Sequence, residues 1–218
     1  MPHKNAVIFD CWHTLFRNSG EDPVEELAEI TGNSKEDREF LKTVEKNLMT
    51  EEQEGEKLRN AIRRTFNELG ASAESGEVSR VFRMFKDTTK SIEPFPEALN
   101  ILESLGEDYR LGLVTNTFYI SQKQLEEQFE IGSYFDAMFL SCQEGVIKPD
   151  SEAFRTTIER LGVEKEEAVM VGDSLEDDVR AARDFGMDAI LVDRDGSVSR
   201  AGVKVVRDLT EIENHLNL

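Results

Sequence analysis

The chain has 218 residues, of which 39% are hydrophobic and 33% charged, as expected for a globular protein with one good-sized domain, or with a core and a smaller insert. Forty-five acidic and 26 basic residues give a net charge of −19, which argues against general nucleic-acid binding and against anionic membrane surfaces. No apolar run approaches the roughly 20 residues that span a bilayer, and no basic and apolar leader opens the chain, so a cytoplasmic protein is expected.

The chain opens on a short apolar run that ends in an acidic residue. Residues 6–9 read Ala-Val-Ile-Phe, which predicts a strand buried on both faces, and Asp10 follows directly. In a parallel α/β sheet, the carboxyl ends of the strands form the edge at which ligands bind. A carboxylate there is costly unless a metal, a partner or a reaction keeps it ionised. Capping of a helix or turn is the alternative for an isolated aspartate.

Residues 16–91 have helical rather than strand patterning. Apolar residues recur there every three or four positions, which predicts about four helices that bury one face each in a small bundle. The stripes are Phe40, Leu41, Val44 and Leu48; Leu58, Ile62, Phe66 and Leu69; and Val78, Val81, Phe82 and Phe85. No strand is expected between Phe16 and Thr89. Pro94 and Pro96 predict a hinge that leads back out of this insert.

After this hinge, strand and helix patterns alternate. The predicted strands are Leu111–Val114, Ala137–Leu140, Ala168–Val171, Ala189–Val192 and Val203–Val206. Helices are predicted around 97–105, 121–129, 151–161 and 177–185, the third capped by Asp150. Alternation of this kind predicts a parallel sheet with helices on both faces. The expected fold is therefore α/β: a Rossmann-like core from 1–15 and 92–218, with a helical cap inserted at 16–91.

Polar side chains stand where several predicted strands end. Asp10 follows the first strand, and Thr115 and Asn116 follow the next one of the core; Lys148 lies in a later loop, and Asp173 follows the strand from 168. Because the carboxyl ends of parallel strands share one edge, these groups are expected in a single pocket. Clustered carboxylates need a cation, and hard oxygen ligands suit Mg²⁺. The set predicts an anionic ligand bound to a metal, with Asp10 as candidate nucleophile.

Four segments that carry these residues resemble the motifs of the haloacid dehalogenase (HAD) superfamily. They are Asp10-x-x-x-Thr14, Val114-Thr115-Asn116, Val146-Ile147-Lys148-Pro149-Asp150 and Val171-Gly172-Asp173-Ser174-x-x-x-Asp178. Their order, spacing and placement on strands all match, and the resemblance spans essentially the whole chain. The insert at 16–91 is similar to the type 1 helical cap of that family.

The resemblance implies a Mg²⁺ site. The metal would lie between the Asp10 carboxylate, the backbone carbonyl of Trp12, Asp173 and the phosphate of the substrate. Asp178, or alternatively Asp177, would hold a water molecule bound to the metal. The side chain at position 12 is not needed for this arrangement, because only its carbonyl would bind.

The resemblance also implies how a phosphorylated substrate is bound and cleaved. Asp10 would attack phosphorus and become an aspartyl phosphate. Thr115 and the Asn116 amide would bind phosphate oxygens, and Lys148 would neutralise charge. Phosphoryl transfer is catalysed mainly by positioning and charge neutralisation, which is what such a set supplies.

The sequence departs from the family pattern at Trp12. Most phosphatases of the family have there a second aspartate, which protonates the leaving group and then activates water, and His13 replaces a residue that is commonly glycine. Tryptophan cannot transfer protons, and acid–base help is worth about 10²–10⁴ in rate. Slow hydrolysis of aryl and acyl phosphates, and hardly any of alkyl phosphates, is therefore predicted. Efficient alkyl turnover would point instead to His13, or to a residue of the cap, as the acid.

Two alternatives to a phosphatase stay open. The dehalogenase branch of the family carries an aromatic residue, a tyrosine, at the position of Trp12, but it works without a metal and has a less acidic fourth motif. Without a cation, Asp173, Asp177 and Asp178 would repel a haloacid carboxylate. The other alternative is a catalytically weak member that binds a phosphate ligand. The expected partner is a small, phosphorylated molecule, and the oligomeric state is left open. Three residues of the insert are candidates for a second anionic group, with a solvated helix face as the alternative: Arg59, Arg63 and Arg64.

Overall fold

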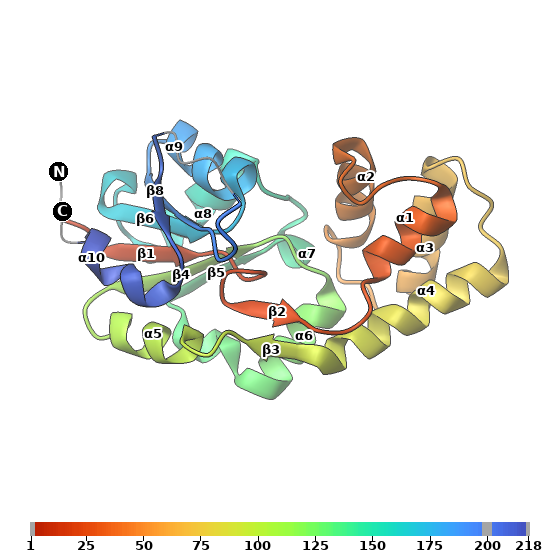
Figure 1. Cartoon of the computed structure of the whole chain (residues 1–218), viewed down its shortest axis with the longest axis horizontal. Helices are drawn as coiled ribbons and strands as arrows, with labels where there is room; N and C mark the ends of the chain where they lie inside the picture. Colours follow the sequence, from red (N-terminus) through yellow and green to blue (C-terminus); the bar gives the residue numbers. More distant parts are fainter. Residues whose placement is uncertain (1–2, 198–201, 217–218) are drawn as a thin grey trace.

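The computed structural model describes residues 3–197 and 202–216 and has a six-stranded parallel sheet at its centre (Figure 1). The strand order is β5-β4-β1-β6-β7-β8. The strands are β1 (Ala6–Phe9), β4 (Arg110–Thr115), β5 (Ala137–Leu140), β6 (Ala168–Gly172), β7 (Asp188–Val192) and β8 (Lys204–Val206). Each predicted core strand is present, and the predicted α/β class is confirmed. The first strand occupies the middle of the sheet, where Phe9 is in register with Leu113 of β4 and Val171 of β6.

Helices cover both faces of this sheet, because alternate side chains of β1 point to opposite sides. Val7 and Phe9 pack in one cluster with apolar residues of α5 (Ala98–Leu105), α6 (Tyr119–Phe129) and α10 (Glu213–Leu216). Ala6 and Ile8 pack in another with α8 (Ser151–Leu161) and α9 (Ala181–Phe185). Asp150 caps α8 as predicted, its carboxylate accepting a hydrogen bond from the Glu152 amide at 2.9 Å. The remaining short elements of the core are α7 (Ser141–Glu144), η2 (Ile131–Tyr134), η3 (Lys165–Glu167), η4 (Leu175–Arg180) and η5 (Leu209–Glu211).

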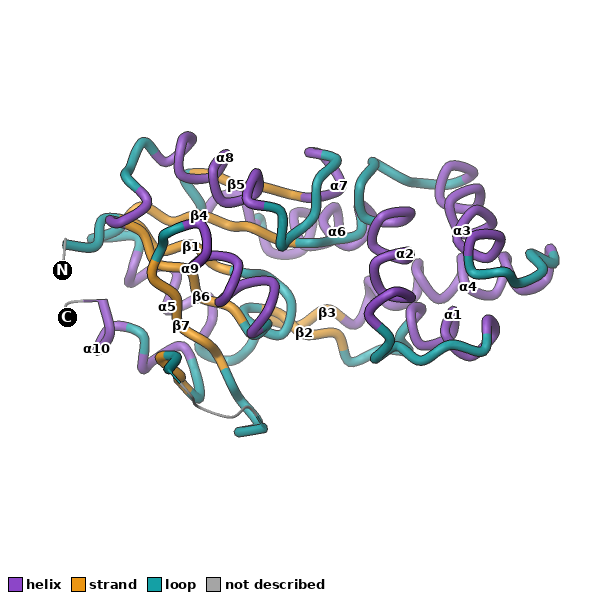
Figure 2. Tube along the Cα trace, turned by 90° about the horizontal axis from the view of Figure 1, so that it is seen from above, coloured by secondary structure: helices purple, strands orange, loops and turns teal. Residues whose placement is uncertain are grey.

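The insert forms a separate group of four helices with an apolar core of its own (Figures 1 and 2). The helices are α1 (Pro23–Thr31), α2 (Arg38–Leu48), α3 (Glu56–Glu68) and α4 (Ser75–Thr88), and the short η1 (Thr89–Ser91) follows. Asp22 and Asp37 cap α1 and α2 with their carboxylates. The predicted stripes meet in this core, which includes Phe40, Phe66 and Phe85. Across the described part of the chain, no helix has the length and apolar character that a membrane span requires.

A two-stranded ribbon connects the helical insert to the sheet. β2 (Phe16–Asn18) runs antiparallel to β3 (Ile92–Pro94), and Phe16 is in register with Pro94. The prediction that no strand lies between Phe16 and Thr89 is therefore wrong. Three residues are too few to show a strand pattern, two of the three in β2 are exposed, and the partner strand follows more than 70 residues later. We propose that core and cap meet at this ribbon, with the cap at 16–91.

One arginine joins the base of the ribbon to the loop that follows β1. Arg194, in the loop after β7, donates a hydrogen bond to the Thr14 carbonyl at 2.8 Å and pairs with Glu97 at 2.8 Å. Its guanidinium lies 3.5 Å from the centre of the Phe95 ring. Arg194 thus holds together the segment that enters the insert, at Thr14, and the segment that returns from it, at Phe95.

Candidate active site

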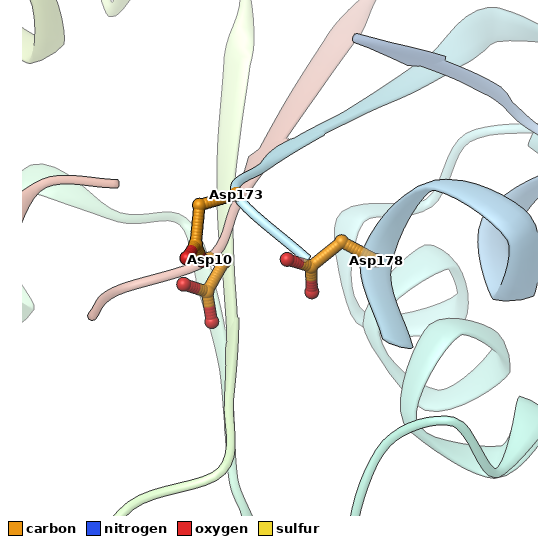
Figure 3. Close-up of side chains that lie close together, drawn as sticks. All are labelled: Asp10, Asp173 and Asp178. Atoms are coloured by element: carbon orange, nitrogen blue, oxygen red, sulfur yellow. The ribbon is translucent and has the colours of Figure 1, made fainter. Parts of the chain in front are cut away.

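Three carboxylates gather at the carboxyl edge of the sheet (Figure 3). Asp10 continues from β1 and donates its backbone N–H to the Val171 carbonyl of β6 at 2.9 Å, which keeps the two strand ends level. Asp173 follows β6, so the carboxylates of Asp10 and Asp173 lie side by side. Asp178 points toward them from the helical turn beyond. Each residue offers an oxygen within 4.8 Å of the others, as expected from strand ends in a parallel sheet.

The turn after β6 is built so that Asp178 faces inward. Ser174 begins η4, and its hydroxyl accepts a hydrogen bond from the Asp177 amide at 3.1 Å. The Asp178 carboxylate in turn accepts one from the Ser174 amide at 3.0 Å. Gly172 makes room for this side chain, since a Cβ at that position would collide with the Asp178 carboxylate. Asp178 is 0% exposed.

Lys148 links two of the carboxylates. Its Nζ donates to Oδ1 of Asp10 and to Oδ1 of Asp178, at 2.6 Å in each case, and the residue is only 4% exposed. Burial lowers the pKa of Lys148, but the two carboxylates outweigh this effect and keep the pKa above its usual value. A permanently charged ammonium is therefore held between Asp10 and Asp178.

The end of β4 supports the loop that carries Lys148. The Asn116 side chain accepts a hydrogen bond from the Lys148 amide at 2.8 Å and donates one to the Lys148 carbonyl at 3.1 Å. Thr115, which is almost completely buried, ends β4 beside it. The structure thus brings Thr115, Asn116 and Lys148 together at the edge where Asp10 and Asp173 lie. Binding of phosphate oxygens by Thr115 and Asn116 stays a prediction.

The carboxylate cluster has too little positive charge around it. Burial raises the pKa of Asp10 to about 7, and repulsion by Asp178 and Asp173 adds to the rise while Lys148 opposes it. The pKa of Asp173 is raised to about 7 for the same reasons, burial first and Asp178 second. Three crowded carboxylates share one ammonium, so a hard divalent cation with a preference for oxygen ligands fits this donor set.

Comparisons with known proteins agree with this geometry. A family model described as haloacid dehalogenase-like hydrolase matches residues 4–186. The chain belongs to the haloacid dehalogenase-like hydrolase family. The helical insert between β1 and β4 is consistent with the type 1 cap of that family.

Individual relatives of this hydrolase include phosphatases and dehalogenases. The glyceraldehyde 3-phosphate phosphatase of Methanopyrus kandleri is 33% identical over 128 residues, which cover 58% of this chain and 55% of the relative. The chain thus spans about half the length of the curated relatives it matches. A solved HAD phosphatase from Thermococcus onnurineus superposes with a TM-score of 0.65 at 27% identity and covers 97% of both chains. A 2-haloacid dehalogenase from Pseudomonas syringae shares the fold, with a TM-score of 0.67 at 20% identity and 98% coverage of both chains.

Trp12 and His13 occupy the turn that follows β1 of this hydrolase. The indole N–H of Trp12 donates a hydrogen bond to the Thr117 hydroxyl at 3.2 Å, and the ring is partly buried against the core. His13 has a φ of 60°, the left-handed region in which glycine is favoured, and its side chain is exposed. Binding of a metal by the Trp12 carbonyl stays a prediction. So does a role of His13 as an acid.

Asp177 and Asp178 take different places in the HAD site. Asp178 belongs to the carboxylate cluster, whereas Asp177 is half-buried and faces the cap, where Arg38 of α2 lies 3.9 Å from its Oδ1. Burial raises the pKa of Asp177, and the neighbouring Asp178 adds to the rise. Of the two candidates for the metal-bound water, the geometry favours Asp178.

Sequence reasoning missed one titratable residue, Glu45 of α2. Burial raises the pKa of the Glu45 carboxyl to about 7, and the charge of Asp177 adds to the rise. The neighbouring Asn116 side chain and the charges of Lys148 and Arg38 act in the opposite direction. These neighbours place Glu45 beside the rim of the core. The available signal was its spacing of seven residues from Arg38, which puts both on one face of the helix.

The three cap arginines that were candidates for a second anionic group have partners within the cap. Arg59 lies 3.9 Å from the centre of the Phe82 ring. Arg63 pairs with Glu56 at 3.0 Å, and Arg64 donates to the Asn47 side chain at 3.0 Å. These local partners favour the alternative, a solvated helix face, and binding of a second anionic group by these arginines stays a prediction.

Proposed function

We propose that this HAD hydrolase is a Mg²⁺-dependent phosphatase that cleaves a small phosphate monoester through an aspartyl phosphate on Asp10. The observation that carries the proposal is the pairing of a buried Asp10 with Lys148 at 2.6 Å, beside two further carboxylates. This group of three carboxylates and one ammonium suits an anionic substrate that is bound together with a cation. The phosphatases among the relatives support the same reaction class.

The residues of the chain would divide the work as follows. One carboxylate oxygen of Asp10 attacks phosphorus in line with the leaving oxygen, while Lys148 orients that carboxylate and balances negative charge. Thr115 and Asn116 bind phosphate oxygens at the end of β4. The groups that would hold Mg²⁺ are Asp10, the Trp12 backbone carbonyl, Asp173 and, through a water, Asp178. When bound, the metal supplies positive charge to the phosphate.

A metal-free dehalogenase fits this site less well. A haloacid carries a carboxylate, and it would enter next to Asp10, Asp173 and Asp178 with only Lys148 to compensate them. Like charges at such distances repel strongly in a buried site. The dehalogenase structure that shares the fold is 20% identical and gives no argument for the substrate.

The test is a screen of phosphorylated metabolites and of p-nitrophenyl phosphate with Mg²⁺, repeated with EDTA and with Asp10→Asn. Hydrolysis should require Mg²⁺, and Asp10→Asn should abolish it. Calorimetry should show Mg²⁺ binding that Asp173→Asn weakens. Halide release from a haloacid in EDTA would overturn the proposal in favour of a dehalogenase. Phosphate-analogue binding without turnover would identify a member that only binds its ligand.

A further inference from the structure

One helix of the cap faces the catalytic edge of the core. In both views α2 is the cap helix on the side of the sheet (Figures 1 and 2). Another side of this helix is buried in the cap, with Phe40, Val44 and Leu48 in the apolar cluster. The ion pair of Arg38 with Asp177 fixes which face of α2 meets the core. Residues seven apart lie on one face of a helix, so Glu45 is directed to the same side.

The neighbours of Glu45 are residues of the site itself. They include Asp177 from η4, Lys148 from the loop before α8, Asn116 from the end of β4, and Arg38 from α2. Lys148 contacts the nucleophile Asp10, and Asn116 holds the Lys148 backbone. Glu45 is therefore a carboxyl group contributed by the cap to the space above the strand ends.

The side from which Glu45 approaches matters for the chemistry. Asp10 attacks from the sheet edge, and the leaving oxygen must lie on the far side of phosphorus in an in-line displacement. The far side is the side of the cap, because α2 covers the edge there. The turn after β1 carries Trp12 in this chain, which cannot give a proton, so the donor for the leaving group is expected on α2.

We propose that Glu45 is the general acid and base of this active site, in the role that Trp12 cannot fill. The proposal rests on the proposed phosphatase function. As the Asp10 oxygen bonds to phosphorus, the bond from phosphorus to the ester oxygen breaks, and the Glu45 proton moves to that oxygen to release an alcohol. The Glu45 carboxylate then takes a proton from water, whose oxygen displaces Asp10 from phosphorus and releases phosphate.

The surroundings of the two rival donors agree with this assignment. The Trp12 indole is engaged with the Thr117 hydroxyl, and His13 is exposed on a turn whose carbonyl faces Arg194. Glu45 is partly buried on the cap, and its raised pKa of about 7 leaves both the protonated and the ionised carboxyl populated near neutral pH. A pKa near the working pH is what a group needs in order both to give and to take a proton.

The test compares Glu45→Gln with Glu39→Gln, a matched change on the exposed side of α2. Each is assayed with Mg²⁺ on an alkyl phosphate, such as a sugar phosphate, and on p-nitrophenyl phosphate. Glu45→Gln should lower kcat/KM, which reports formation of the aspartyl phosphate, about 10²–10⁴-fold on the alkyl substrate and far less on the aryl substrate, since nitrophenolate leaves without a proton. Glu39→Gln should match the unaltered protein on both. The fall of kcat/KM for the alkyl substrate above about pH 7 should disappear with Glu45→Gln.

The remaining outcomes separate this proposal from the proposed function. If the unaltered protein hydrolyses the aryl but not the alkyl phosphate, the phosphatase stands and the role of Glu45 is overturned. Equal losses of kcat/KM on both substrates in Glu45→Gln would also overturn it, because they indicate positioning alone. If neither substrate is hydrolysed, the phosphatase and Glu45 fail together. As a further support, Trp12→Asp added to Glu45→Gln should restore alkyl hydrolysis.

Discussion

The core rim and the face of the cap hold their charged groups in opposite ways. At the rim, Lys148 lies between Asp10 and Asp178, buried and with both distances at 2.6 Å. Between the cap and the core, the side chains of Arg38 on α2 and Asp177 on η4 are 60% and 39% exposed and stand 3.9 Å apart. A buried charge without its partner is strongly destabilising, whereas an exposed pair contributes about 0–1 kcal/mol. The rim is therefore a fixed frame, and the cap rests on it through contacts that are easily broken and remade.

The two regions also bury their apolar residues separately. The sheet has a cluster on each face, and the cap has a third, which Phe118 of the core joins from its edge. The Phe118 ring meets Phe85 of α4 at 4.8 Å between centroids. Contacts of this limited kind permit the cap to open for substrate without loss of either core.

The largest effect that tests this contrast is expected from Lys148→Met. The change leaves Asp10 and Asp178 buried without a counter-charge, so it should abolish turnover and lower the free energy of unfolding by about 3–5 kcal/mol. Urea unfolding of the metal-free protein measures the loss. Lys4→Met is the control at the other end of the sheet, because Asp188, the partner of Lys4, is 45% exposed and can be hydrated. Equal losses from the two changes would contradict a special role for the rim.

Phe66→Ala tests whether the cap core stands apart from the rim. Phe66 is fully buried in the cap cluster, and its truncation should cost about 3–5 kcal/mol of cap stability. Hydrogen exchange should show faster opening of α1 to α4 than of the sheet. Calorimetric Mg²⁺ binding should change little. A comparable loss of Mg²⁺ affinity would show that the two regions form one cooperative unit.

Arg38→Gln should have the smallest effect. It removes an exposed pair with Asp177, so the free energy of unfolding should fall by less than about 1 kcal/mol. The expected change is in KM rather than in kcat, since the contact helps to hold the cap down while the reacting groups stay in place. Added salt should screen the Arg38–Asp177 pair in the unaltered protein, whereas the variant, which lacks this pair, should not show that part of the salt effect. A large fall in kcat would instead assign Arg38 to the reaction.

Much of the core could be predicted because its strands are short, apolar on both faces and bounded by helices. That pattern located Ala6–Phe9 and the strand from Ala168, and the edge they share then followed from parallel pairing. The meeting of Asp10, Asp173 and Lys148 is a consequence of topology, so their positions in the sequence were sufficient.

The remaining features depend on tertiary contacts that no local pattern encodes. The ribbon of Phe16–Asn18 forms only against a partner from the other end of the insert. The choice between Asp177 and Asp178 depends on a wide helical turn, in which the Val179 amide reaches the Ser174 carbonyl at 3.1 Å. Glu45 was missed because the orientation of α2 toward the rim is a property of the docked cap, and in the sequence it is one glutamate among many.

The ribbon that joins the two regions also limits the path of the cap. Its strands are paired over three residues, from Phe16 with Pro94 to Asn18 with Ile92, and Arg194 secures the base at Thr14 and Phe95. Two independent linkers would allow the cap to twist and slide, whereas a ladder of backbone hydrogen bonds flexes across its face and resists shear along its strands. The cap is therefore expected to rotate about a single hinge axis at the ribbon. Each closure would then return α2 to the same height above the strand ends, so a proton donor on a moving part arrives at a reproducible distance.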